Sequence, residues 1–422
     1  MSKLALLGGK PVIEHPLQLY RSIGAEEKEA VIKVMDDGCL SGFVGAWCDE
    51  FHGGPLIQQF EDSWAKRFGV GHAVTMNSNT SGLIAAMGAV GVGPGDEVII
   101  PAWSMSATAM APIFYGGIPV FADIEDDFFC LDLESVRSNI TDKTKAIIAV
   151  NLFGHPAELK SLRALADEFS IKLIEDNAQA PLGMESGLHT GTIGHIGVFS
   201  LNYHKHIHTG EGGVCTTDDD ELAMKLKMIR NHGENVVSSL NIENLENLVG
   251  YNFRMTELSA AVGLCQLEKM EVLVGERIAL AEKLSSSVKD FSGITPPLTR
   301  ENCQHVYYLW GAKYDEKEVG IGRDIFAKAL EAEGCPTSVG YVEPLYLLPL
   351  FQKRIAIGAE GFPFNLSNRI YERGLCPVTE HLHEKEMLEF FICSYQLAGD
   401  DLDRVIDAYC KVYENRNDLV NL

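Results

Sequence analysis

Short apolar runs alternate with amphipathic stretches between about residue 60 and residue 230. The runs at 97–101, 118–121, 146–151 and 171–176 have the length and composition of buried strands. The stretch 159–169, which separates two of these runs, carries apolar residues at helical spacing. This alternation predicts an α/β fold in which helices cover a mostly parallel sheet.

The pattern changes in the last third of the chain. Residues 256–290 predict one long helix, and a β-rich run at 305–313 follows it, with further helices over 325–332 and 401–413. A chain of 422 residues is longer than one ordinary hydrophobic core requires. We therefore predict a large domain over 1–275, including an N-terminal arm, and a smaller α+β domain over 276–422.

One lysine stands out within this alternation. Lys205 lies between the end of an apolar strand at Phe199 and a glycine-rich turn at 210–213. A lysine held in a pocket can lose its proton and attack a carbonyl group, which forms a Schiff base. A surface lysine in a polar loop explains this segment equally well when it is taken alone.

The segment 74–86 indicates a strand, a tight turn and the start of a helix. Free N–H groups at a helix start suit a phosphate, and Thr80 and Ser81 add hydroxyl groups. A helix cap without any ligand is the alternative. Because this alternative requires no ligand, the segment alone does not establish a phosphate site.

Two further segments carry polar side chains at positions that suit a cofactor. The run 171–176 ends in Asp176, and Gln179 follows three residues later. A carboxylate at the end of a parallel strand faces the ligand crevice and could hold a protonated pyridine nitrogen. A helix-capping aspartate is the alternative. The segment 248–263 places Asn252 and Arg254 before a helix of small residues, where an ordinary loop is the alternative.

Taken together and in order, these segments resemble the DegT/DnrJ/StrS sugar aminotransferases, which are fold-type I enzymes that use pyridoxal 5'-phosphate. The resemblance also covers residues 22–28, 93–101, 116–123, 141–146 and 375–377. It implies that Lys205 is the Schiff-base lysine and that Asp176 is the acid paired with the pyridine nitrogen, so that both are catalytic. It also implies a set of cofactor-binding residues, namely Asn79, Thr80, Ser81, Asp176, Gln179, Ser200, Lys205 and Asn252. In this family Asn252 would reach the phosphate from the neighbouring subunit of a homodimer.

The chain departs from the family pattern at several positions. Asn79 stands where the family often has glycine, and because asparagine tolerates left-handed turns we expect the phosphate turn to persist. The aromatic ring that usually covers the cofactor corresponds to Met105, with Trp103 two residues earlier, so either residue could stack on it. Relatives that carry histidine in place of Lys205 are dehydratases, and the retained lysine favours transamination.

The resemblance implies transfer of an amino group from L-glutamate to a keto or aldehydo sugar. The resemblance at the motif around Lys205 and at the long segment 42–54 implies 3,8-dideoxy-8-oxo-manno-octulosonate, an intermediate of lipopolysaccharide sugar biosynthesis, as the acceptor. A nucleotide-linked 3-keto or 4-keto hexose is the alternative, and both acceptors are anionic. The segment 42–54 itself is either a loop over the active site or dimer seam, or a surface insertion without a role.

Two other classes of protein are alternatives to an aminotransferase. A nicotinamide-dependent dehydrogenase is suggested by the glycines at 91–95, but this run lacks the Gly-x-Gly-x-x-Gly spacing and precedes a strand. A non-catalytic cofactor-binding homologue is the other, and the joint retention of Lys205, Asp176 and the phosphate turn argues against it.

Composition narrows the setting in which the protein works. The formal charge of −24 is opposite to that of a nucleic-acid-binding protein. No run of 18 apolar residues predicts a transmembrane helix, and the apolar stretch in the first ten residues is too short for a signal peptide. Ten scattered cysteines without Cys-x-x-Cys pairs indicate reduced thiols in the cytoplasm.

An anionic acceptor bound by such an acidic chain requires local cations. Arg230, Arg254 and the histidines at 204, 206 and 208 are candidates, because they lie in or near the segments described above. A metal site at these histidines is not predicted, since no carboxylate or cysteine completes a recognisable ligand set.

Overall fold

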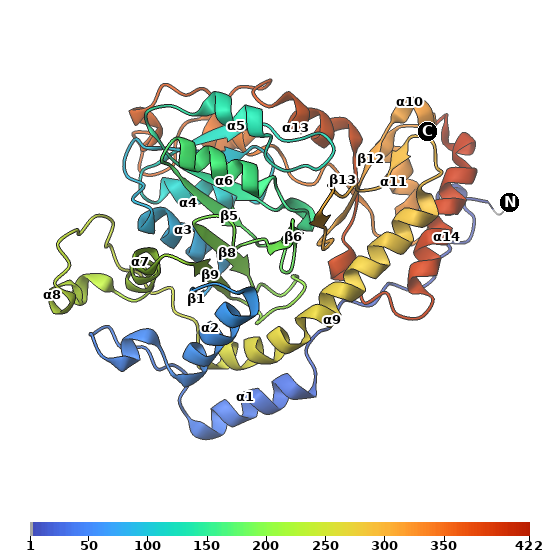
Figure 1. The fold of residues 1–422 in the computed structure, drawn as a ribbon. Coiled ribbons are helices and arrows are strands. Elements are labelled where there is room, and N and C mark those ends of the chain that lie inside the picture. The colour runs from blue at the N-terminus through green and yellow to red at the C-terminus, as the bar shows by residue number, and fades with distance from the viewer. Residues whose placement is uncertain (1–2) are drawn as a thin grey trace.

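The computed structural model describes residues 3–422, and its largest element is a seven-stranded sheet (Figure 1). The strands lie in the order β1 (His72–Met76), β9 (Gly213–Thr217), β8 (Ile196–Ser200), β5 (Lys172–Asp176), β4 (Thr144–Val150), β2 (Glu97–Pro101) and β3 (Ile118–Ala122). Only β9 runs antiparallel to its neighbours, β1 and β8. The predicted α/β fold with a mostly parallel sheet is therefore confirmed.

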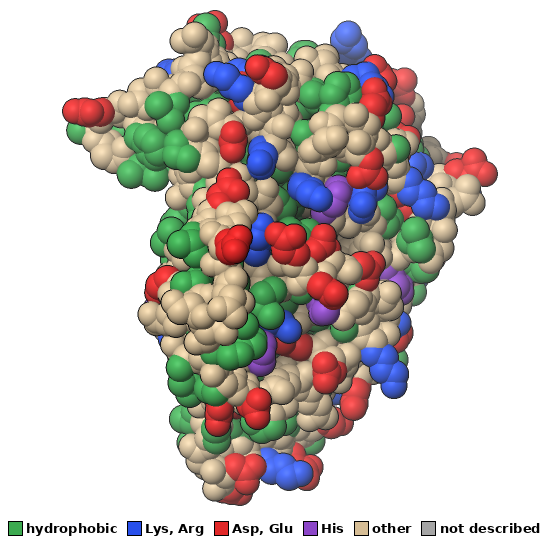
Figure 2. All heavy atoms as spheres, turned by 60° about the vertical axis from the view of Figure 1, so that its left-hand side comes forward, with side chains coloured by type: hydrophobic (Ala, Val, Ile, Leu, Met, Phe, Trp, Pro, Cys, Tyr) green, Lys and Arg blue, Asp and Glu red, His purple; other side chains and the backbone are tan. Residues whose placement is uncertain are grey.

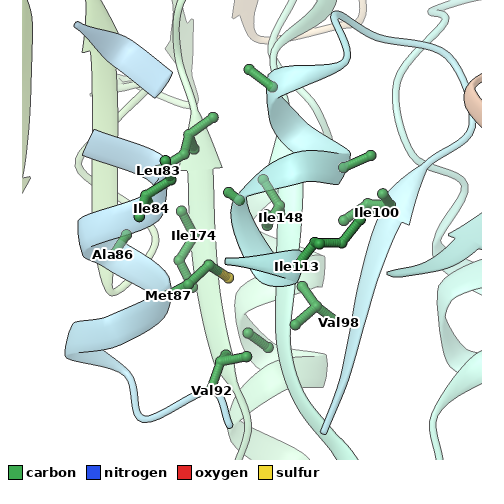
Figure 3. Close-up of a cluster of buried hydrophobic side chains, with 14 of the residues drawn as sticks. Leu83, Ile84, Ala86, Met87, Val92, Val98, Ile100, Ile113, Ile148 and Ile174 are labelled. Carbon is green, nitrogen blue, oxygen red and sulfur yellow. The ribbon is translucent and has the colours of Figure 1, made fainter. Parts of the chain in front are cut away.

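Helices cover both faces of this sheet. The helices of this part of the chain are α1 (Ala25–Asp37), α2 (Pro55–Phe68), α3 (Asn79–Ala89), α4 (Ala107–Ile113), α5 (Leu133–Asn139), α6 (Leu159–Glu168), α7 (Asp220–Arg230) and α8 (Val237–Leu240), of which α1 and α8 lie apart from the sheet (Figure 1). Side chains alternate along a strand, so Val98 and Ile100 of β2 belong to the same buried cluster as Leu83 of α3 (Figure 3), whereas Ile99 belongs to the cluster that contains Leu162 of α6. Burial on both faces explains the continuous apolar runs in the sequence.

A second, antiparallel sheet is formed by the C-terminal part of the chain. Its order is β10 (Ile294–Thr295), β12 (Trp310–Tyr314), β14 (Met387–Phe390) and β13 (Ser338–Val339). The helices here are α10 (Glu316–Val319), α11 (Arg323–Ala332), α12 (Pro349–Gln352), α13 (Pro377–His381) and α14 (Asp401–Glu414). A small sheet of β11 (Cys303–Gln304), β6 (Met184–Glu185) and β7 (Leu188–His189) links this part to the first.

One helix joins the two main sheets. Helix α9 (Glu257–Val288) runs from the large sheet to the C-terminal one (Figure 1), as the pattern over 256–290 predicts. It crosses residue 275 without interruption. A domain boundary at 275/276 therefore stays a prediction.

The first residues of the chain pack on its last third. Leu4, Ile13 and Leu17 belong to the same apolar cluster as residues of α11 and α14. The buried Glu333 carboxylate accepts hydrogen bonds from the backbone N–H groups of Ala5, at 2.8 Å, and Val12, at 3.0 Å. The N-terminal arm is thus built into the C-terminal core.

The segment 42–54 folds onto the large sheet's side of the molecule. Phe43 and Phe51 are buried, and the Asn231 side chain donates hydrogen bonds of 3.0 Å to the carbonyls of Val44 and Phe51. Trp47 is half exposed. The segment is therefore anchored at its base and presents an aromatic residue at the surface.

Charged side chains of both signs are interspersed on the face shown in Figure 2, and hydrophobic side chains reach this surface in several places. Within residues 3–422, every helix is too short or too polar to cross a membrane. All ten cysteines lie in the described part of the chain and are free thiols.

Candidate active site

A cavity of about 210 Å³ opens at the carboxyl ends of the parallel strands. Val150 ends β4, Asp176 ends β5 and Ser200 ends β8, and all three line it. Lys205 lines it from the loop between β8 and β9. This is where open α/β sheets bind their ligands, because the strand ends and the following turns converge there.

Lys205 is buried in this cavity, with 8% of its surface exposed. Its Nζ atom lies 4.2 Å from the centre of the Tyr308 ring. Burial lowers the pKa of Lys205 to about 8, and the opposite charge of Asp176 limits this fall. A substantial fraction of the amine is therefore neutral near pH 8, as a nucleophile or proton acceptor requires.

Asp176 is the acid of the cavity and is 4% exposed. Its Oδ2 atom accepts a hydrogen bond of 2.9 Å from the Thr108 hydroxyl group. Its Oδ1 atom accepts bonds from the Asn79 side-chain amide, at 3.2 Å, and from the Ala178 N–H, at 3.3 Å. Burial raises the pKa of Asp176, and these hydrogen bonds oppose the rise because they favour the ionised form.

The strand, turn and helix start that the segment 74–86 predicts are present, and α3 begins at Asn79. Ser78 caps the helix, because its hydroxyl oxygen accepts the Ser81 N–H at 3.0 Å, and Ser78, Asn79 and Thr80 line the cavity. The Ser81 hydroxyl is bonded within the turn to Asn77 and Ser78, so Ser81 contributes to the shape of the turn. A Cβ on Gly213 would lie 2.6 Å from the Ser78 backbone, which explains the glycine there.

Gln179 is fixed in orientation. Its Oε1 atom accepts the Phe153 N–H at 2.6 Å, and its Nε2 atom donates to the Tyr341 hydroxyl group at 3.0 Å. Tyr341 has a left-handed backbone with φ of 53°, and its N–H donates to the Glu389 carboxylate. Burial raises the pKa of Glu389 to about 7. The second sheet thus positions one wall of the cavity.

Met105 and Trp103 occupy different environments. Met105 lines the cavity and is 59% exposed. Trp103 is fully buried and donates from Nε1 to the Val342 carbonyl at 2.8 Å. Of the two candidates for stacking on the cofactor ring, only Met105 has access to it.

The predicted cations lie in unexpected places. Arg230 is completely buried and forms an ion pair with Glu61, so the prediction that it receives an anionic substrate is wrong. His206 lies behind the cavity, bonded to the Val306 carbonyl at 2.7 Å, whereas His204 lines the cavity. Burial lowers the pKa of His204 and of His206 to about 4, so neither supplies a positive charge near neutral pH.

Asn252 does not line the cavity of its own chain. It is exposed and pairs through its backbone with Asn231. Its predicted contact with the phosphate of a partner subunit stays a prediction.

The sequence did not identify four residues that line the cavity, namely Ser104, Glu211, Tyr308 and Tyr341. It also did not identify Thr108, which donates a hydrogen bond to Asp176. The two tyrosines come from positions more than one hundred residues beyond Lys205. Thr108 lies only three residues after Met105, so its hydroxyl group is a local signal for a donor to Asp176.

These residues fit pyridoxal 5'-phosphate. The cavity combines a buried amine, a carboxylate for a protonated ring nitrogen and a helix start for a phosphate. The buried Oδ1 atom of Asn79 has no hydrogen-bond partner within residues 3–422, which leaves an acceptor for a bound molecule.

The model of the DegT/DnrJ/EryC1/StrS aminotransferase family matches residues 23–390. The chain belongs to this family. It is 32% identical to the spore coat polysaccharide biosynthesis protein SpsC of Bacillus subtilis, over 92% of this chain and 94% of that protein. It is 33% identical to the GDP-perosamine synthase of Vibrio cholerae, over 81% of this chain and 89% of that protein.

Among solved structures, DesI in the presence of its TDP-sugar product matches with a TM-score of 0.82 and 28% identity, over 99% of this chain and 98% of that one. The chain is therefore a pyridoxal 5'-phosphate-dependent sugar aminotransferase, and the predictions of family, enzyme class and cofactor are confirmed.

Proposed function

We propose that this aminotransferase moves an amino group from L-glutamate to a nucleotide-linked keto-hexose, with Lys205 as the proton carrier and Asp176 as the acid that faces the ring nitrogen. The observation that carries the proposal is the convergence of Lys205, Asp176 and the α3 start on one cavity. Each part has an ordinary structural explanation alone, and their convergence matches the needs of this cofactor.

When bound, the cofactor supplies an electron sink that stabilises negative charge on the donor α-carbon. The Lys205 Nζ atom holds the proton that leaves this carbon, which it can do because burial keeps part of its amine neutral. Thr108, Asn79 and the Ala178 N–H donate hydrogen bonds to Asp176, and these bonds favour its ionised form. Lys205 then delivers a proton to the product side of the reaction.

The proposed class of acceptor, a nucleotide-linked sugar, rests on the relatives. GDP-perosamine synthase and DesI with its TDP-sugar product support a nucleotide-linked sugar. The relatives reported above lend no support to 3,8-dideoxy-8-oxo-manno-octulosonate, which becomes the alternative. A cytoplasmic location and a role in lipopolysaccharide biosynthesis stay predictions.

A second copy of the chain is part of the proposal. Lys205 is the one cation that lines the cavity within residues 3–422, where it faces the carboxylates of Asp176 and Glu211. An anionic acceptor therefore meets too little positive charge from one chain alone. We expect Asn252 and Arg254, which precede α9, to reach into the active site of the partner subunit.

Covalent trapping tests the assignment of Lys205. Borohydride reduction of the cofactor-loaded protein, followed by peptide mapping, should place the adduct on Lys205. Lys205→Ala should lose both the adduct and transamination, whereas the exposed Lys317→Ala should keep both. An adduct on another lysine would refute the proposed site.

The reverse reaction tests the acceptor. The enzyme is incubated with 2-oxoglutarate and, separately, with a panel of GDP- and TDP-linked amino-hexoses and with 8-amino-3,8-dideoxy-manno-octulosonate. We expect glutamate to form with a member of the nucleotide-linked panel. Glutamate formation from the eight-carbon sugar acid alone would replace the proposed acceptor with the alternative.

A further inference from the structure

Asn79 makes a contact that a glycine at the same position could not make. It is the first residue of α3 and belongs to the phosphate turn. Its side chain leaves this turn and reaches the carboxylate of Asp176, which lies at the end of β5 and 97 positions away in the sequence. One residue therefore connects the turn at the start of α3 with the acid of the cavity.

The orientation of the Asn79 amide follows from the chemistry of its neighbour. An ionised carboxylate only accepts hydrogen bonds, so the amide must present its Nδ2 group to Asp176, as the 3.2 Å contact shows. The Oδ1 atom is then directed elsewhere. It is buried and has no partner in the described chain, although Asn79 lines the cavity.

Helix capping does not account for this side chain. Ser78 is the capping residue of α3, since its hydroxyl oxygen accepts the Ser81 N–H. The Asn79 amide takes no part in that hydrogen bond. Its one hydrogen bond within residues 3–422 is the bond to Asp176.

Donors from two different helices hold the carboxylate of Asp176. Thr108 of α4 donates to Oδ2 at 2.9 Å, and Asn79 of α3 donates to Oδ1 at 3.2 Å. Without Asn79, Oδ1 would keep only the long 3.3 Å bond from the Ala178 N–H. The carboxylate would then be free to rotate about its bond to Cβ, because one oxygen alone would be firmly held.

We propose that Asn79 is a positioning residue that locks Asp176 to the phosphate turn, and that its free Oδ1 atom accepts a hydrogen bond from the molecule bound in the cavity. The proposal rests on the proposed function, because it takes Asp176 as the partner of the ring nitrogen. Asn79 thereby fixes the relative position of the phosphate-binding N–H groups and the acid. A charge-assisted bond of this kind also favours the ionised form of Asp176.

A double-mutant cycle in the full chain tests the lock. Affinity for pyridoxal 5'-phosphate is measured for the parent, Asn79→Ala, Asp176→Asn and the double variant. Asn79→Ala should weaken binding about ten- to a hundredfold in the parent background, and less than about threefold in the Asp176→Asn background. Equal losses in both backgrounds would overturn the proposal, because Asn79 would then act independently of Asp176.

The variant Asn79→Asp separates positioning from shape. It nearly conserves the size of the side chain but places a second carboxylate against Asp176, so it should bind the cofactor more weakly than Asn79→Ala. Binding by Asn79→Asp that equals or exceeds binding by Asn79→Ala would overturn the proposal. Ser78→Ala serves as a control for helix capping. Its loss of affinity for pyridoxal 5'-phosphate should be the same in the parent and in the Asp176→Asn background.

Unfolding of the cofactor-free protein distinguishes a failure of this proposal from a failure of the proposed function. The destabilisation by Asn79→Ala should be greatest where Asp176 is ionised, and should fall as the pH drops and Asp176 becomes protonated. It should be absent in the Asp176→Asn background. A pH-independent loss overturns the lock, whereas a failure to trap Lys205 with borohydride would refute the function alone.

Discussion

The variant Glu61→Gln should destabilise the protein severely, because it leaves a buried arginine without its counter-charge. The Arg230 side chain is completely buried and its Nη1 atom lies 2.5 Å from Glu61 Oε1. The same carboxylate oxygen accepts the N–H and the hydroxyl group of Thr75, both at 2.8 Å. Glu61 therefore neutralises one charge and satisfies two donors at the end of β1.

The magnitude follows from this burial. Removal of one partner from a buried ion pair costs about 3–5 kcal/mol, since the remaining charge is neither solvated nor paired. The surface pair of Arg137 and Glu168 has side chains that are 42% and 54% exposed, and such pairs contribute at most about 1 kcal/mol. Glu168→Gln is therefore a matched control with the same chemical change.

Urea unfolding of the two variants and the parent, followed by circular dichroism, measures the difference. Glu61→Gln should lower the free energy of unfolding by several times the change in Glu168→Gln. The double variant Glu61→Met/Arg230→Met should lose less than the sum of its single variants, because it removes both charges. Equal effects of Glu61→Gln and Glu168→Gln would refute the reasoning.

Three further outcomes are expected. Asp176→Asn should retain the cofactor but slow the half-reaction with glutamate at least a hundredfold, on the order of a lost catalytic proton-transfer group, and near-parental single-turnover rates would remove Asp176 from its role. Mixed Lys205→Ala and Asn252→Ala subunits should regain activity that neither has alone, and an inactive mixture of subunits that demonstrably exchange would refute the shared site. Burial lowers the pKa of Lys205 to about 8, so the rate of covalent cofactor capture by the cofactor-free protein should rise with pH up to about 8 and level off above it. Stopped-flow absorbance measures this rate. A flat profile between pH 7 and 9 would contradict the assignment.

The local parts of the site could be predicted from the sequence. Lys205, Asp176 and Gln179 follow strands of a parallel sheet, and the carboxyl ends of such strands meet at one edge. The helix start at Asn79 follows β1 in the same way. These residues converge because the topology brings strand ends together, so their sequence context was sufficient.

The long-range parts could not be predicted in this way. The sequence does not reveal that Glu61, 169 positions away, neutralises Arg230, so the prediction of a substrate-binding cation at Arg230 is wrong. Tyr308 and Tyr341 enter the cavity from the C-terminal part, where no local motif marks them. The sequence also does not reveal that Trp103 packs against Tyr341 in the core, where it cannot stack on a bound ring.

The N-terminal arm has a consequence for how the chain acquires its structure during synthesis. Leu4 and Ile13 are synthesised well before their packing partners in α11 and α14, which follow more than three hundred residues later. Until then the arm lacks these partners, and its packing into the C-terminal core is incomplete. Tyr341, which completes the wall beside Gln179, is synthesised equally late. Closure of the C-terminal core and completion of the cofactor cavity therefore both belong to the last stage of folding.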